Sequence, residues 1–215
     1  MDGTLVDIES SYATVHGYFG ERNDDGLRRF MANEIDDEEF VRSDIRIWWK
    51  HRPNLRVDEL EEILAGAPIM PGADVLLRGL HARGVRTAIV SGGIDLLAHR
   101  VARDLGIDVA LANGFRVDPD GRLTGEGIVR VPVQHKEEVL TALQAQLGIL
   151  PEETASVGNS EIDVGMFRRS KVGIAFRPED DTVRRAATAI VPGSDLAEVL
   201  EVLREFPEVP SAYRP

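Results

Sequence analysis

Residues 86–93 read RTAIVSGG, an apolar run that stops at one serine and two glycines. Short apolar runs that end in glycines are typical of a buried strand followed by a turn. The same arrangement returns at residues 154–157 (TASV), which are followed by Gly158, Asn159 and Ser160. Two such strands separated by helical segments predict a parallel sheet, because parallel strands need a long crossover between them.

The segments around these two strands follow the same alternation. Residues 109–112, 172–176 and 189–191 are predicted to be further strands, and Asp120-Gly121 predicts a hairpin turn within residues 115–131. Apolar spacing predicts helices at residues 75–83, 96–105, 136–147, 162–169, 180–187 and 195–203. The predicted fold class is therefore α/β, a Rossmann-like doubly wound parallel sheet covered by helices on both faces.

Residues 10–70 have a different pattern. Helical spacing recurs at residues 11–19, 27–33, 37–49 and 57–64, and no convincing strand separates these segments. We therefore predict an inserted α-helical cap at 10–70, a core made of 1–9 and 71–205, and a loose tail at 206–215. Trp48 and Trp49 lie in the cap, where they either pack its small core or contact a substrate.

Composition excludes several classes of function. The chain has no cysteine, which excludes disulfides, zinc–thiolate sites and thiol catalysis. Its net charge of −12 disfavours nucleic acid as a partner, and no apolar run approaches the roughly 18 residues of a membrane helix. Residues 1–10 lack the features of a secretory signal, so a cytoplasmic protein is expected, either a monomer or a homodimer.

Four separated clusters carry the groups that a phosphate and magnesium site needs. They are residues 2–7 (DGTLVD), residues 91–93 (SGG), Lys136, and residues 158–163 (GNSEID). Each alone has an ordinary structural explanation: a turn, a helix cap, a solvated lysine, and an N-cap with an acidic first turn. Because ligands bind at the carboxyl ends of strands in open α/β sheets, their joint placement indicates phosphate held by N–H groups, a hydroxyl and a lysine, beside a hard cation.

The order and wording of these clusters resemble the haloacid dehalogenase superfamily of phosphotransferases, over residues 2 to about 203. The first motif of that family reads Asp-x-Asp-Gly-Thr, and residues 1–7 here read MDGTLVD. Ser91 matches the second motif, Lys136 the third, and residues 158–163 the fourth. Residues 90–93 (VSGG), 112–113 (AN) and 123–125 (LTG) further resemble the phosphoserine phosphatase subgroup.

The resemblance implies a Mg²⁺-dependent phosphomonoester hydrolase that works through an aspartyl-phosphate, most simply on O-phosphoserine in serine biosynthesis. Asp2 would be the general acid and base, and Glu9 would pair with a substrate ammonium group. Arg46 is the candidate for binding a substrate carboxylate. The resemblance also implies that Ser91, the Gly92 N–H and Lys136 bind the phosphate, and that Lys136 is a catalytic residue that stabilises the charge developing on its oxygens. The Asp2 carbonyl, Asn159 and Asp163 would ligate Mg²⁺.

Two departures from the family pattern bear on these roles. The catalytic nucleophile of the family is the first aspartate of motif one, at the end of a central strand, and here Met1 stands after that position. We expect Met1 to be an internal methionine of a longer protein, since a sheet without its central strand would leave both neighbouring strands exposed. The second departure is Asn159, where the family usually has aspartate, and a neutral amide predicts weaker Mg²⁺ binding.

Two alternatives to phosphoserine hydrolysis stay open at this point. One is a phosphatase for another small phosphorylated metabolite, because fold and motifs specify the chemistry better than the substrate. The other is a non-catalytic protein that binds a phosphorylated ligand and has lost its nucleophile.

Overall fold

The predicted α/β architecture is present in the computed structural model, which describes residues 1–205. The strands of these residues form two three-stranded sheets, in the orders β1-β2-β3 and β4-β5-β6. The strands are β1 (Ala88–Ile94), β2 (Val109–Val117), β3 (Leu123–Ile128), β4 (Ala155–Gly158), β5 (Val172–Phe176) and β6 (Ala189–Val191). The predicted loose tail at 206–215 lies outside the described residues.

Strand direction follows the predicted pattern. β1 runs parallel to β2, and β4, β5 and β6 are mutually parallel. β3 is antiparallel to β2, with Val117 opposite Leu123 across the turn that contains Asp120-Gly121. One detail differs, because residues 91–93 continue β1 instead of ending it. The pairing register shifts between Val90 and Ile94, so these residues form an irregular stretch inside the strand.

The two sheets are separate, whereas the sequence predicted one. Within residues 1–205, β1 pairs only with β2 and β4 only with β5, which leaves one edge of each unpaired. Both edges line the same cavity, of about 250 Å³, together with Met1 and Leu5. Its wall is mainly apolar and includes side chains such as Leu76, Ile89 and Leu143. An apolar cavity between two unpaired strand edges is the kind of space that a further strand of the sheet would fill.

The helices are close to their predicted positions. They are α1 (Ser11–Tyr18), α2 (Asp24–Met31), α3 (Asp37–His51), α4 (Val57–Ala65), α5 (Ala73–His81), α6 (Asp95–Leu105), α7 (Lys136–Leu147), α8 (Val164–Phe167), α9 (Asp181–Ala186) and α10 (Glu198–Arg204). α2 begins three residues before the predicted start because Asn23 caps it by accepting from Gly26 N–H. No helix within residues 1–205 is both long and apolar enough to cross a membrane.

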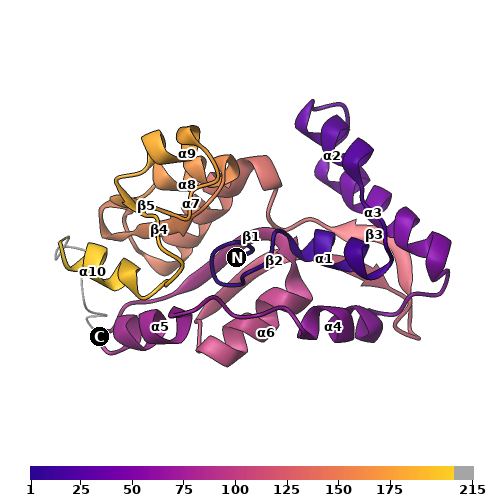
Figure 1. Ribbon diagram of the computed structural model, residues 1–215, viewed down its shortest axis with the longest axis horizontal. Helices are drawn as coiled ribbons and strands as arrows, with labels where there is room; N and C mark the ends of the chain where they lie inside the picture. The colour runs from indigo at the N-terminus through magenta and orange to yellow at the C-terminus, as the bar shows by residue number, and fades with distance from the viewer. Residues whose placement is uncertain (206–215) are drawn as a thin grey trace.

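The helices α1–α4 gather beside the β2–β3 hairpin at one end of the molecule (Figure 1). Trp48 is fully buried, and Trp49 packs so closely on Gly125 that an added Cβ would lie 2.6 Å from its ring. Neither tryptophan lines the polar pocket described below, so packing is the role that their positions indicate. The apolar core around them also contains Ile94 and Leu97 of the β1–α6 unit. The division into core and cap at residues 10–70 stays a proposal.

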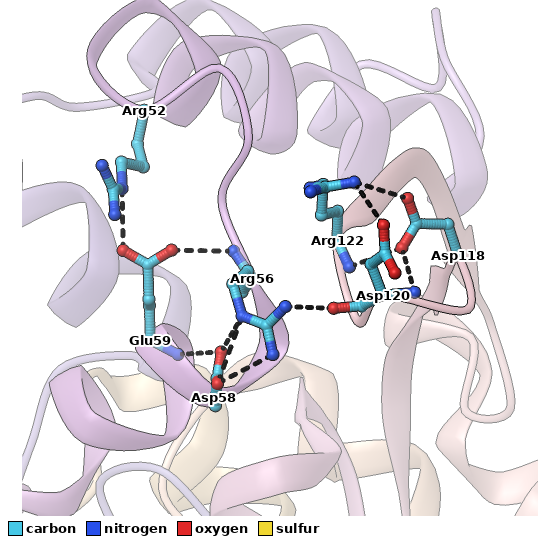
Figure 2. A network of polar contacts seen from close by, with 7 residues as sticks. All are labelled: Arg52, Arg56, Asp58, Glu59, Asp118, Asp120 and Arg122. Carbon is cyan, nitrogen blue, oxygen red and sulfur yellow. Dashed lines mark hydrogen bonds and ion pairs between the residues drawn. The ribbon is translucent and has the colours of Figure 1, made fainter.

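A polar network ties the start of α4 to the tip of the hairpin (Figure 2). Arg56 forms an ion pair with Asp58 and donates to the main-chain carbonyl of Asp120. Two main-chain hydrogen bonds join the same segments: Val57 N–H donates to the Gly121 carbonyl, and Leu123 N–H donates to the Leu55 carbonyl. The start of α4 is thereby joined to the hairpin by backbone hydrogen bonds as well as by side chains.

Candidate functional site

A pocket of about 420 Å³ brings the four sequence clusters together. It opens between the cap helices and the carboxyl ends of β1 and β4, as expected for an open α/β sheet. The predicted site residues that line it are Asp2, Glu9, Ser91, Gly92, Lys136, Asn159 and Asp163. Arg46 is the one predicted residue that does not line it.

Asp2 has one carboxylate oxygen held and one unpartnered. Its Oδ2 accepts from the N–H and the hydroxyl of Ser11, at 2.8 and 2.9 Å. Its Oδ1 is buried without a hydrogen-bond partner. Gly93 allows this arrangement, because an added Cβ would lie 2.7 Å from Asp2 Oδ2. A carboxylate fixed on one side and unpartnered on the other is suited to exchanging a proton with a ligand.

Ser11 is a functional residue that sequence reasoning did not identify. Its hydroxyl is fully buried, donates to Asp2 and accepts from Ile94 N–H at 2.9 Å. The only signal in the sequence was its place at the start of a predicted helix, which is the usual position of a simple cap. Ser11 therefore links the start of α1, the end of β1 and the candidate acid–base residue.

Lys136 and Asp163 form a buried ion pair at 2.9 Å, with each residue only 5% exposed. Burial alone would raise the pKa of Asp163, but the charge of Lys136 and the hydrogen bonds from Lys136 and Ser160 N–H act together against it, and the pKa is lowered. Asp163 Oδ2 accepts from the N–H groups of Asn159 and Ser160. The ordinary explanation for Lys136, a solvated surface lysine, is therefore incompatible with its burial. Asp163 keeps its charge and shapes the loop after β4.

Asn159 is coupled to Glu179, a second residue that sequence reasoning missed. The Asn159 amide nitrogen donates to Glu179 Oε1 at 2.9 Å, and Glu179 N–H donates to the Asn159 carbonyl at 2.9 Å. Glu179 also lines the pocket. It follows β5 by three residues, so the rule that strand ends carry the site could have identified it. A carboxylate therefore stands next to the amide that replaces the expected aspartate.

Ser91 and Gly92 are held in place by hydrogen bonds with neighbouring residues. Ser91 is 3% exposed, and its hydroxyl accepts from Gly93 N–H at 3.1 Å. Asn113 donates to the carbonyls of Gly92 and Val131, at 3.2 and 2.9 Å. This buried amide connects the irregular part of β1 to the loop after β3. The stretch that was expected to receive phosphate oxygens is thus anchored by hydrogen bonds.

Glu9 and Arg46 have different surroundings. Glu9 is exposed at the pocket and, within residues 1–205, makes no hydrogen bond or ion pair. Arg46 lies on the outer face of α3, where its side chain is 60% exposed and paired with Glu39 at 2.7 Å. The neighbouring Ile45 is fully buried, so the helix turns Arg46 away from the interior. The structure does not bring Arg46 to the other predicted residues.

The pocket offers oxygen ligands to a hard cation. Asp2, Asn159, Asp163 and Glu179 all line it, and oxygen is the donor that Mg²⁺ prefers. Within residues 1–205, no three acidic or histidine side chains converge closely enough to form a metal site alone. The residues therefore fit Mg²⁺ only if an amide oxygen, a main-chain carbonyl or water completes the ligand set.

Comparison with known proteins gives a consistent result. Residues 1–168 match the family model of haloacid dehalogenase-like hydrolases. The chain is 35% identical to a phosphoserine phosphatase of Idiomarina loihiensis over 152 residues, which cover 70% of this chain and 68% of that protein. It is 30% identical to a phosphoserine phosphatase of Wolinella succinogenes, covering 93% of this chain and 95% of the relative.

Solved structures agree with the sequence comparisons. A structure described as a phospho-aspartyl intermediate analogue of phosphoserine phosphatase superposes with a TM-score of 0.78 at 26% identity, covering 94% of this chain and 95% of the other. A substrate-bound phosphoserine phosphatase gives the same TM-score and identity, with 94% of each chain covered. The similarity thus extends over both the predicted core and the predicted cap.

Proposed function

The chain belongs to the haloacid dehalogenase-like hydrolase family and is a phosphatase, and we propose that it hydrolyses a small phosphomonoester through an aspartyl-phosphate intermediate. The observation that carries this proposal is the single pocket lined by residues from all four sequence clusters. O-phosphoserine, the substrate in the names of the relatives, is the first ester to test.

Asp2 is the proton-transfer residue in this proposal. Its unpartnered Oδ1 would give a proton to the departing alkoxide and then take one from the attacking water. The bonds from Ser11 hold the other oxygen and therefore fix the direction in which Oδ1 points. One carboxyl group can serve both steps, because the proton that it donates in the first step leaves it as the base that the second step needs.

Phosphate oxygens would be received by Ser91, by the Gly92 N–H and by Lys136. All three line the pocket, and Lys136 supplies a positive charge that is only 5% exposed. Charge that develops on the phosphoryl group would be stabilised strongly there, because a buried cation is poorly screened by water. Asp163 holds Lys136 in position through the ion pair at 2.9 Å.

Magnesium would be held by the Asp2 carbonyl, Asn159 and Asp163, with Glu179 beside them. When bound, it would neutralise charge on the phosphate and orient it for attack. The absent carboxylate at position 159 lowers the negative charge of the ligand set, which predicts weaker binding than an aspartate would give. The carboxylate of Glu179, bonded to Asn159, lies where it can offset that loss.

The nucleophile in this proposal is an aspartate joined directly to Met1. Met1 lines the pocket together with Asp2 and Lys136, so its main-chain nitrogen lies on the pocket side of the first cluster. A residue attached at that nitrogen would therefore lie close to Lys136 and Asp2. Its carboxylate would attack phosphorus and form the covalent intermediate, which water then hydrolyses.

The test uses two N-terminal extensions that differ in one residue. Both add an apolar segment of about five residues, and one ends in aspartate whereas the other ends in asparagine. With Mg²⁺ and O-phosphoserine, we expect phosphate release from the first and a loss of about a thousandfold or more from the second. Equal rates would refute the aspartyl-phosphate route. Ester binding by both proteins without turnover by either would favour the non-catalytic binder.

A further inference from the structure

The wall of the pocket opposite the phosphate-binding groups is strongly acidic. The acidic residues that line it there come from residues 9–44, and they are Glu9, Glu21, Asp24, Asp37 and Asp44. Within residues 1–205, Arg22 is the only arginine or lysine on that side of the pocket. The alcohol part of a bound phosphomonoester would lie against this wall, since the phosphate is directed towards Lys136 and Ser91.

The two cations of the pocket are already paired. Arg22 Nε lies 3.0 Å from Asp24 Oδ1, and both side chains are 74% exposed. Lys136 is paired with Asp163 on the phosphate side. Arg46, the predicted carboxylate-binding residue, is on the outer face of α3 and paired with Glu39. Within the described residues, Arg22 is therefore the one cation on the alcohol side, and a carboxylate there would have to compete with Asp24 for it.

Asp44 is an acidic residue of α3 that lines the pocket although it is buried. It is 2% exposed and accepts from His16 Nε2 at 2.8 Å and from Asn23 at 2.7 Å. Trp48 donates to the other ring nitrogen of His16 at 3.1 Å, and an indole N–H can only donate. His16 Nδ1 is therefore an acceptor and the ring is neutral, so no cation balances Asp44. A buried position on the pocket wall is thus occupied by an acid whose neighbours are neutral donors.

Two further groups on this wall suit a cation. Tyr12 lines the pocket, and its hydroxyl is buried without a hydrogen-bond partner. That oxygen can accept a hydrogen bond from an ammonium group. Glu9, exposed and unpaired at the entrance, adds a full negative charge.

We infer that the phosphomonoester of this pocket carries an ammonium group on its alcohol part and no carboxylate, as in the phosphate ester of a simple amino alcohol. This inference rests on the proposed function and narrows its substrate. A carboxylate would meet a wall lined by five acidic residues and one arginine, which is already paired with Asp24. An ammonium group would meet several acceptors.

The test compares two esters that differ only in that carboxylate. Isothermal titration of the 215-residue protein with Mg²⁺ and either O-phosphoethanolamine or O-phosphoserine measures both affinities without an extension. We expect the ethanolamine ester to bind about tenfold or more tightly than the serine ester, as like-charge repulsion near a protein surface predicts. Ethylene glycol monophosphate, which replaces the ammonium by a hydroxyl, should also bind more weakly than the ethanolamine ester.

A matched pair of variants assigns the preference to the pocket. Glu9→Gln should reduce the advantage of the ethanolamine ester over ethylene glycol monophosphate by about fivefold or more. Glu62→Gln, which changes another exposed glutamate that lies on α4 outside the pocket, should leave it unchanged. Neither glutamate makes a hydrogen bond in the described residues, so both variants should fold.

The outcomes separate this inference from the proposed function. Tighter binding of O-phosphoserine, or an ammonium preference that survives Glu9→Gln, would overturn the inference while leaving a phosphatase site. Inorganic phosphate provides the reference, because it tests the phosphate-binding groups alone. If neither phosphate nor any ester binds, the proposed function fails and the inference fails with it.

Discussion

Position 159 shows how one amide changes a site whose other parts are in place. Asn159 donates to Glu179, and its own oxygen faces the Thr4 hydroxyl at 3.5 Å. An aspartate there would lose the donated bond and place two carboxylates side by side. The amide thus keeps the loop after β4 joined to the loop after β5 in the absence of a cation.

We predict that Asn159→Asp raises the affinity for Mg²⁺ by about tenfold and lowers stability when Mg²⁺ is absent. Calorimetric titration measures the affinity, and thermal unfolding with and without Mg²⁺ measures the stability. Glu179→Gln is the matched variant, since glutamine can still accept from Asn159 but carries no charge. It should weaken Mg²⁺ binding, and unchanged titrations for both variants would show that neither side chain contributes to a metal site.

At the scale of elements, the starts of β1 and β2 are joined by one carboxylate. Asp108 accepts from the N–H and the hydroxyl of Thr87, at 2.7 and 3.0 Å. Burial would raise the pKa of Asp108, but these hydrogen bonds outweigh it and the pKa is lowered. A carboxylate with a depressed folded-state pKa stabilises the protein above its unfolded pKa, and this contribution is lost as the pH falls through the folded value.

We therefore predict that Asp108→Asn destabilises the protein by about 1 kcal/mol near neutral pH. The difference from the parent should shrink between about pH 5 and pH 3, because the parent carboxylate is then protonated. Urea unfolding at several pH values measures it. A difference that is constant with pH would mean that the charge of Asp108 does not contribute to the link between these strands.

Also at the scale of elements, α3 and the start of α4 are attached to the β2–β3 hairpin. Trp49 lies against Gly125, whose φ of +93° suits glycine, and Arg56 reaches the hairpin tip through the network of Figure 2. Exposed ion pairs of this kind contribute little energy individually, so the contact at Trp49 and the backbone bonds carry most of the attachment. Helix α3, which lines the pocket, is thereby attached to the hairpin.

At the scale of the whole molecule, the cavity of about 250 Å³ between β1 and β4 separates two half-sheets. We predict that an apolar extension of about five residues before Met1 raises the free energy of unfolding by several kcal/mol, since it would fill the cavity and pair both edges. The gain should be similar whether the extension ends in aspartate or asparagine, because filling the cavity does not depend on the reacting group. Urea unfolding measures it, with a Gly/Ser extension of equal length as the control. Equal stability of the apolar and Gly/Ser forms would refute strand insertion.

The sequence alone determined the fold class and most of the pocket. Alternating strands and helices specified the α/β layers, and the polar residues at the ends of two strands specified Asp163, Ser91 and Asn159. The fold class is confirmed because strand and helix periodicities are local. The predicted site residues line one pocket because the carboxyl ends of parallel strands must share one edge of a sheet, and their roles stay a prediction. Only the tertiary structure decided the contacts that join distant segments: Ser11 on Asp2, Glu179 on Asn159, and the outward direction of Arg46. Each depends on how helices and loops far apart in the chain pack together, and no local pattern encodes that packing.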